Sequence, residues 1–463
     1  MLQLMKHVLE LVPFYLCYHK LVKIFIKQLI ELWGTSEDSI RIISFRCLLK
    51  LMNNLNEKQI KFTFNNLYLS CMRNCRFTNA TSLPSINFMK QSLVELYCLK
   101  PDVAYNCCFT FLQQMARHLH SALQSKKKES LQSVNNWQFC HSMSIWGQLV
   151  GQKNDNKFIK SLQHPLVEII LGCVRLNHSP AYMPLRLFCA RVLARLSEQT
   201  SVYIPVLPII LEVISQLLQL FKSTPKQTSM KSCTFACCLR MNKNELKEKA
   251  FLDAAMDEIF ELLLYYCSLY SHTVGFPELV LPLTIQLKKF IKSSRAENYV
   301  KKLKQVHEKI LSTSENIKKK RRQASIDIRN QDSLSSFEET LRGETNDIKK
   351  FYDSWMKLRI KQLEMLASKK EQICKDKLPE IKKPSIREKS EEEKEKDKKK
   401  IKSLFKINGQ DDGDDEDDDE EEDDDVERLT CFCLFANPLL TVWADVSDFI
   451  ASAWDVLIDF ILA

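Results

Sequence analysis

The sequence predicts an all-α protein, organised as a HEAT- or armadillo-like α-solenoid of antiparallel helix pairs and followed by a disordered charged tail. One observation is the low glycine content, eight residues in 463, against about 7 % in an average protein. The others are long segments with apolar residues at helical spacing and prolines that punctuate them. Phosphate-cradling loops, dinucleotide folds and nucleophile elbows need glycine at sharp turns, so the composition disfavours these enzyme classes.

The first clear helical unit is a hairpin. Residues 20–33 place lysines and Glu31 on one face and leucine, isoleucine and phenylalanine on the other. Gly34 is positioned to end this helix, and Ser36 can cap the next one, whose apolar positions run over 40–51. The pattern therefore predicts two consecutive antiparallel helices.

Comparable segments follow along the chain, and from residue 180 onward prolines mark several helix starts. The later predicted helices cover residues 85–99, 102–124, 131–150, 165–176, 185–197, 205–221, 244–270, 277–292 and 297–322. No period-two strand pattern competes over a useful length. Pairs of about 35–45 residues without exact repeats are typical of a helical solenoid, and a compact irregular helical domain is the alternative.

These patterns divide the chain into five regions. Residues 1–322 form the helical-repeat domain, 323–346 a polar linker and 347–378 an amphipathic helix. Residues 379–428 form a disordered tail, first rich in lysine and glutamate and then acidic. Residues 429–463 form an atypical apolar C-terminal segment.

The C-terminal segment has an unusual distribution of charge. From Leu439 nearly every residue is apolar, except for a narrow helical face. That face holds Asp445, Asp448, Ser452, Asp455 and Asp459. Four aspartates at about 2.5–3.5 kcal/mol each disfavour a bilayer span, and an acidic face disfavours anionic membranes, so no membrane partner is expected. Three alternatives remain for this segment. It docks on a partner, it docks on the solenoid, or it is an end for which no function was selected.

The charge is divided between the body and the tail. The net charge is +9, and Asp411–Glu427 contributes −15 without a basic residue, so the rest of the chain carries +24. A basic body with an acidic tail indicates work beside nucleic acid or basic proteins such as histones. A merely solvated charge run is the alternative.

The candidate metal and catalytic residues do not form known motifs. Seventeen cysteines occur without any C-x-x-C spacing, which predicts reduced, buried thiols in an intracellular protein. His307 and Glu308 begin like a zinc-protease motif, but Leu311 occupies the position of the second ligand. We therefore expect no catalytic residue, no cofactor and no metal.

The sharpest short motif is a run of five bases, Lys318, Lys319, Lys320, Arg321 and Arg322. Such a run after a helix, followed by a polar linker, is typical of a nuclear-import signal or a nucleic-acid contact. A solvated helix end is the alternative interpretation.

Aromatic residues are not interleaved with bases as in single-strand binders, so any RNA contact is expected to involve mainly phosphates. Trp33, Trp137 and Trp146 lie on apolar helix faces, which favours roles as core anchors over binding hot spots.

Several long stretches carry a family resemblance. They are LWGTSEDSIRIISFRCL (32–48), RNCRFTNATSLPSINFMKQSLVELY (73–97), SVNNWQFCHSMSIWGQLV (133–150), HPLVEIILGCVRLNHSPAYMPLRLFCARVL (164–193), YIPVLPIILEV (203–213) and GFPELVLPLTIQLKKFIKSSRAENY (275–299). In this order, over roughly residues 1–325, the chain resembles the nucleolar complex protein two family. Both ends depart from the family pattern, which has a long charged segment before this domain and usually ends in charged sequence.

The resemblance implies a function without catalysis. Family members are helical-repeat assembly factors of the large (60S) ribosomal subunit. They act in the nucleolus and nucleoplasm, on pre-60S particles and rRNA, as heterodimers with related nucleolar complex proteins. The resemblance thus implies a non-enzymatic scaffold. The alternative that it implies is a nuclear transcriptional corepressor that inhibits histone acetyltransferases, with the acidic tract binding histones. A helical interaction module acting elsewhere is a third alternative.

Overall fold

A computed structural model of the chain describes residues 2–376, except for short gaps at 17–18, 126, 153–155, 222–234, 294–296, 325–328 and 344–345. Within these residues every regular element is a helix and no strand occurs, which confirms the predicted all-α class. The expected tail at 379–428 and the C-terminal segment at 429–463 lie outside the described residues.

The helices follow one another with short connections. The first nine are α1 (Leu2–Tyr15), α2 (His19–Thr35), α3 (Asp38–Met52), α4 (Glu57–Asn74), α5 (Leu83–Leu99), α6 (Pro101–Ser125), α7 (Lys128–Val134), α8 (Trp137–Gly151) and α9 (Lys157–Ser161). The others are α10 (Gln163–Leu176), α11 (Met183–Thr200), α12 (Leu207–Leu220), α13 (Lys249–Tyr270), α14 (Phe276–Leu279), α15 (Leu281–Ser293), α16 (Glu297–Gln323), α17 (Gln331–Gly343) and α18 (Asp347–Asp376). Three 3₁₀ turns, η1 (Pro180–Tyr182), η2 (Phe235–Cys237) and η3 (Glu245–Lys247), join some of them.

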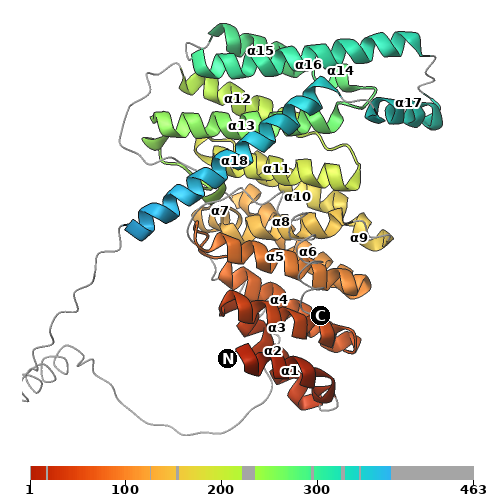
Figure 1. Cartoon of the computed structure of the whole chain (residues 1–463), viewed down its shortest axis with the longest axis vertical. Coiled ribbons are helices and arrows are strands. Elements are labelled where there is room, and N and C mark those ends of the chain that lie inside the picture. The colour runs from red at the N-terminus through yellow and green to blue at the C-terminus, as the bar shows by residue number, and fades with distance from the viewer. Residues whose placement is uncertain are drawn as a thin grey trace, which may run out of the picture. The chain divides into compact units, whose positions relative to one another are not determined.

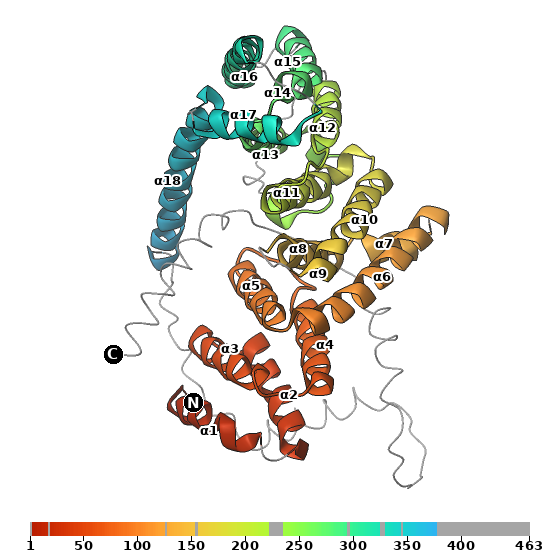
Figure 2. The same ribbon diagram turned by 90° about the vertical axis from the view of Figure 1, so that its right-hand side faces the viewer.

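Residues 358–376 belong to a separate compact unit, so the packing described here concerns residues 2–357. In this part the helices stack in chain order (Figures 1 and 2). One row of neighbours runs through α1, α3, α5, α8, α11, α13 and α16. A second row contains α2, α4, α6 and α10, and further along α12 packs on α15. Each helix thus contacts mainly helices that are close in sequence.

The core is one continuous cluster of buried residues, which runs from Met5 on α1 to Ile348 on α18. Trp33, Trp137 and Trp146 are all buried, which confirms their predicted role as core anchors. The Trp146 ring lies 5.2 Å from the ring of Tyr68 on α4 and 5.6 Å from that of Tyr97 on α5. Helices α4, α5 and α8 therefore meet at one indole.

Ion pairs join α11 to α12 and to α13, the two helices that follow it. The buried guanidinium of Arg186 donates to the Glu212 carboxylate on α12. Farther along α11, Arg191 pairs with Glu258 at 2.5 Å and with Glu261 at 3.2 Å, both on α13. These ion pairs are mostly shielded from water. They neutralise the buried charges and constrain how α11 is oriented against α12 and α13.

Residues 323–346, expected to be a polar linker, contain helix α17, which the sequence pattern did not indicate. Leu341 is buried, the Glu338 carboxylate accepts from the Val274 amide at 3.0 Å, and Asn346 donates to the Ser271 carbonyl at 2.8 Å. These contacts hold the segment against the connection after α13. Because most of them are polar and long-range, helical periodicity alone does not reveal them.

Helix α18 begins where the sequence predicts an amphipathic helix. Its first turns pack on α13, with the Trp355 ring 5.4 Å from that of Phe260 and the Tyr352 ring 6.0 Å from that of Tyr265. Among the described helices, none combines the length and the apolar character that a bilayer crossing requires.

Candidate nucleic-acid and partner interface

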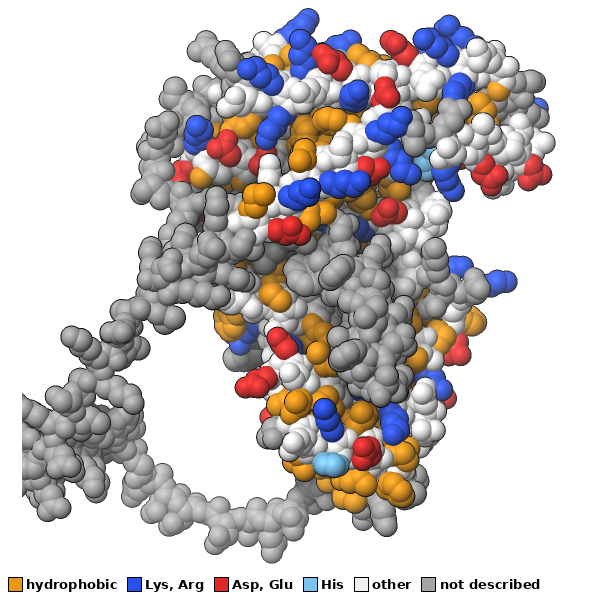
Figure 3. Space-filling model, viewed as in Figure 1, with side chains coloured by type: hydrophobic (Ala, Val, Ile, Leu, Met, Phe, Trp, Pro, Cys, Tyr) orange, Lys and Arg blue, Asp and Glu red, His pale blue; other side chains and the backbone are white. Residues whose placement is uncertain are grey.

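Helices α15 and α16 pack together and carry the densest positive charge of the described chain. Residues 281–323 contain thirteen Lys and Arg residues against three Glu. The buried face of α16 has apolar residues at helical spacing, namely Leu303, Val306, Ile310 and Ile317. Because the apolar stripe is narrow, the lysines project toward solvent, as the blue side chains at this end of the stack show in Figure 3.

The exposed side of α16 forms a feature that we call the basic ridge. It consists of Lys301, Lys304, Lys319 and Arg322, all exposed to solvent. Glu308 and Glu315, which are also exposed, lie between the two pairs on the same side of the helix. Clustered lysine and arginine side chains bind nucleic-acid phosphates and release condensed counterions. The chemistry that this ridge offers is therefore anion binding.

The predicted basic run Lys318–Arg322 lies in the last turns of α16, inside the helix that the sequence predicts over 297–322. Consecutive side chains on a helix point about 100° apart, so the five bases surround the axis. Arg321 donates to both carboxylate oxygens of Glu278 at 2.8 Å and to the Val274 carbonyl at 3.3 Å. Arg321 thus anchors α16 to α14. Lys318, Lys319 and Arg322 remain the exposed members of the run.

Contacts with α13 hold the other end of α16. Lys302 pairs with Asp257 at 2.9 Å, and the Tyr299 hydroxyl donates to the Asp253 carboxylate. His307 is buried, and its burial, reinforced by the charge of Lys288, lowers its pKa. The side chain that begins the zinc-protease-like sequence therefore lies in a helix interface.

The described cysteines have the environment that the sequence predicts. Twelve of them form no disulfide, and eleven of these twelve are buried. Burial raises the pKa of Cys47 to about 11 and that of Cys267 to about 12, so both remain protonated near neutral pH. Within the described ranges, no group of three or more His, Cys, Asp or Glu residues is arranged to hold a metal ion.

A second surface feature, an aromatic patch on α6 and α9, is absent from the sequence predictions. The Tyr105 ring lies 6.1 Å from that of Phe109 and 5.8 Å from that of Phe158. Phe109 is 49 % exposed and Phe158 is 61 % exposed. Asn156 positions Phe158, because it accepts from the Phe158 amide at 2.9 Å and donates to Asp102 at 3.1 Å. The only sequence signal was the i, i+4 pair of rings on α6.

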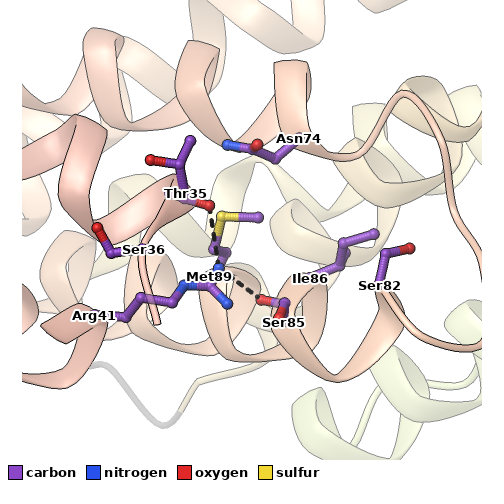
Figure 4. A pocket seen from close by; sticks show the side chains of 9 residues that line it. Thr35, Ser36, Arg41, Asn74, Ser82, Ser85, Ile86 and Met89 are labelled. Atoms are coloured by element: carbon purple, nitrogen blue, oxygen red, sulfur yellow. Dashed lines mark hydrogen bonds between the residues drawn. The ribbon is translucent and has the colours of Figure 1, made fainter. Parts of the chain in front are cut away.

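A small pocket of about 180 Å³ lies between α2, α3, α4 and α5. Figure 4 shows Arg41 reaching across it. The guanidinium donates to the carbonyls of Trp33 at 2.9 Å, Gly34 at 3.4 Å and Ser85 at 3.5 Å, and it lies 5.5 Å from the Phe88 ring centroid. Arg41 satisfies carbonyls near the end of α2 and joins that end to α5, so the pocket is a structural junction.

Comparisons with known proteins all relate the chain to nucleolar complex proteins. A profile described as the Noc2p family matches residues 58–355. Nucleolar complex protein 2 of Drosophila melanogaster is 34 % identical over 387 residues, which cover 83 % of this chain and 50 % of that protein. Nucleolar complex-associated protein 2 of Arabidopsis thaliana is 31 % identical over 308 residues, 66 % of this chain and 40 % of that protein.

A nucleolar complex protein 2 homolog of Caenorhabditis elegans is 24 % identical over 359 residues, covering 76 % of this chain and 50 % of that protein. The chain spans half of the length of these relatives or less.

The contacts of Arg41 predict its contribution to stability. Arg41→Ala should lower the free energy of unfolding by about 2–3 kcal/mol, because buried carbonyls lose a charged donor. Urea denaturation followed by circular dichroism measures this change. Arg46→Ala on the same helix, at a partly exposed position, is the control and should change stability by about 0.5 kcal/mol or less. Equal stability of Arg41→Ala and the wild type would contradict the structural role.

Proposed function

The chain belongs to the Noc2p family, and we propose that it is a non-enzymatic scaffold in the assembly of the large (60S) ribosomal subunit. The observation that carries this proposal is the match to nucleolar complex proteins over the same residues that build the helical stack. The basic ridge adds a means of contacting pre-ribosomal RNA.

We infer a HEAT- or armadillo-like α-solenoid from the two rows of helices, because each helix packs on its neighbours in sequence. Such an array offers extended helix faces on which other proteins can lie. Related nucleolar complex proteins, as heterodimer partners, and pre-60S particles are the partners that we propose. The aromatic patch is one exposed surface suited to a protein contact, since exposed aromatic rings are favoured at interfaces.

For RNA we propose phosphate contacts along the basic ridge. Arg321 and Lys302 are held by ion pairs, so they set the position of α16. The ridge residues project from that fixed helix. We propose a location in the nucleus, both in the nucleolus and in the nucleoplasm.

The basic ridge provides the first test of function. Changing Lys301, Lys304, Lys319 and Arg322 to alanine should reduce the slope of log affinity against log salt for an rRNA fragment by about three, if all four contact phosphates. In cell extracts the wild-type chain should sediment with pre-60S particles and leave them after RNase treatment. The variant should sediment more slowly before treatment.

The matched control changes four exposed lysines elsewhere, Lys58, Lys61, Lys127 and Lys128. It should keep the wild-type salt slope and sedimentation. A wild-type chain that never sediments with large-subunit precursors would contradict the proposed function. An unchanged slope in the ridge variant would contradict only the placement of RNA on α16.

Nuclear import provides a second test. Changing Lys318, Lys319 and Arg322 to alanine while keeping Arg321 should reduce nuclear accumulation of a fluorescent fusion, because these are the exposed members of the basic run. Arg321→Ala is the matched control and should retain nuclear accumulation. Normal accumulation of the triple variant would refute a dominant role and direct attention to the lysine-rich residues 394–402.

The second candidate function is chromatin-associated transcriptional repression with inhibition of histone acetyltransferases. The observation that favours it is the polyanion Asp411–Glu427, which lies outside the described residues. A polyanion attracts basic histone tails over a distance set by ionic screening. The same charge competes with RNA for the basic ridge.

Deletion of Asp411–Glu427 tests this candidate. The deletion should lower histone affinity and raise non-specific RNA affinity in low salt, because the competing negative charge is removed. Raising the salt from about 50 to 300 mM should weaken histone binding by the intact chain steeply, since the Debye length falls from roughly 14 to 6 Å. Unchanged affinities after deletion would show that the acidic tract is a solvated spacer.

A further inference from the structure

The first helix pair of the stack exposes an apolar surface, which we call the end face. It consists of Leu4, Leu11 and Phe14 on α1 and of Leu21 and Ile24 on α2, each between 45 % and 68 % exposed. Figure 3 shows hydrophobic side chains gathered at the lower end of the stack, where Figure 1 places α1. In helical arrays the outer face of a terminal repeat is normally polar. The end face therefore differs from an ordinary cap of such an array.

The other sides of α1 and α2 are already used in the fold. Met5 and Val12 on α1 are buried, and α1 packs on α3 while α2 packs on α3 and α4. The Tyr15 ring of α1 stacks on the Phe25 ring of α2 with 4.6 Å between the centroids. A helix with apolar residues around most of its circumference is normally buried between other helices. Helix α1 thus has the residue pattern of an interior helix at an exposed position.

The exposed residues of α1 have a symmetric spacing. Leu4, His7, Leu11 and Phe14 are all exposed and lie three, four and three residues apart, so they form one seam along the helix. His7 is the one polar member, and its Nδ1 atom lies 3.8 Å from the Glu10 carboxylate. The spacing is the same when it is read in either direction. Two copies of α1 packed antiparallel therefore place Leu4 opposite Phe14 and His7 opposite Leu11.

The charged side chains of this helix pair do not lie on the seam. Lys23 and Lys27 of α2 lie over the Phe62 ring of α4, each 5.8 Å from its centroid. Because consecutive residues on a helix point about 100° apart, Lys6 and Glu10 lie on a different side of α1 from the seam. The centre of the end face is therefore free of like charges that would repel a second copy. It also offers no row of charges that would select an acidic or a basic partner.

The exposed area is comparable with the apolar part of a dimer interface. If one residue of this size exposes roughly 180 Å² in full, the five residues of the end face present about 500 Å². A standard interface buries about 800 Å² on each partner, and somewhat more than half of this is apolar. A monomer seldom leaves a larger apolar patch than this exposed to water.

We propose that the end face is the contact between two copies of the chain, which pair end to end about a two-fold axis. Helix α1 of one copy lies antiparallel along α1 of the other, so Leu4 of each copy contacts Phe14 of the other. The two α1–α2 hairpins then pack together as in a four-helix bundle. This inference goes beyond the proposed assembly function, which does not require a dimer.

Pairing through α1 leaves the other end of each stack free. The helices stack in chain order, so α16 lies far from α1 within each copy (Figures 1 and 2). The dimer therefore carries two basic ridges, one toward each outer end. An RNA long enough to reach both ridges binds more tightly than to one, because the second contact is intramolecular.

Sedimentation equilibrium of the full chain tests the pairing. The sample is treated with nuclease and kept in about 300 mM salt, where the Debye length is roughly 6 Å and bridging by residual nucleic acid is weak. The wild type should approach twice its monomer mass of 54.1 kDa, with a Kd on the order of micromolar or tighter. A mass that stays at one copy well above micromolar concentration would overturn the proposal and leave the end face to a different partner.

Substitutions on α1 test the site. Leu4→Lys with Leu11→Lys should raise the Kd at least about hundredfold, because each change enters a two-fold interface twice and places a charge among apolar side chains. The matched control is Leu281→Lys with Ile285→Lys, which changes similarly exposed aliphatic residues on α15. The control should keep the wild-type Kd. An unchanged Kd for the α1 variant, or equal dissociation of the control, would contradict the assigned surface.

Charge exchange tests the antiparallel register. One variant carries Leu4→Lys with Phe14→Lys, and a second carries Leu4→Glu with Phe14→Glu. Each variant alone places like charges opposite one another and should sediment as a monomer. Their equimolar mixture pairs lysine with glutamate and should associate at least about tenfold more tightly than either variant with itself. A mixture that associates no better than the separate variants would contradict this register.

Circular dichroism of each variant checks the fold, and the helix content should match that of the wild type because the changed side chains are exposed. These measurements contain no RNA or ribosomal particles, so their failure leaves the proposed assembly function unaffected.

Discussion

The structure depends on one constraint, that each amphipathic helix must bury its apolar face against helices close to it in sequence. No sheet joins distant segments in the described residues, so stability comes from a succession of local interfaces. Trp146 shows how one such interface forms, because its ring lies close to Tyr68 and Tyr97 from two earlier helices. At the end of α2, Arg41 donates hydrogen bonds to backbone carbonyls, which apolar packing cannot supply with a donor.

This constraint also determines where binding surfaces arise. Side chains inside the stack are committed to packing, so partners must use the outer faces of the helices and the ends of the array. At α15 and α16 the outer faces combine strong positive charge with exposed aliphatic side chains. On α6 and α9 the exposed rings lie far from this basic end in sequence. A scaffold with two separated surfaces can hold a protein and an RNA at the same time.

The all-helical class and the anchoring tryptophans could be predicted from the sequence because helical periodicity directly reports which face is buried. The ion pair of Arg321 with Glu278 could not, since it joins residues 43 positions apart. Helix α17 and the aromatic patch were also missed. Their contacts, such as Glu338 with Val274 and Tyr105 with Phe158, join residues about fifty or more positions apart. Local sequence patterns contain no information about such pairs.

The central claim is that this scaffold contacts pre-ribosomal RNA through the end of the stack formed by α15 and α16. Ultraviolet cross-linking of the full chain in cells, followed by mass spectrometry of the RNA-linked peptides, tests it most directly. The account predicts cross-links to large-subunit precursor rRNA concentrated within residues 297–323, with few on α4. Cross-links distributed over other helices, or no link to precursor rRNA, would contradict it.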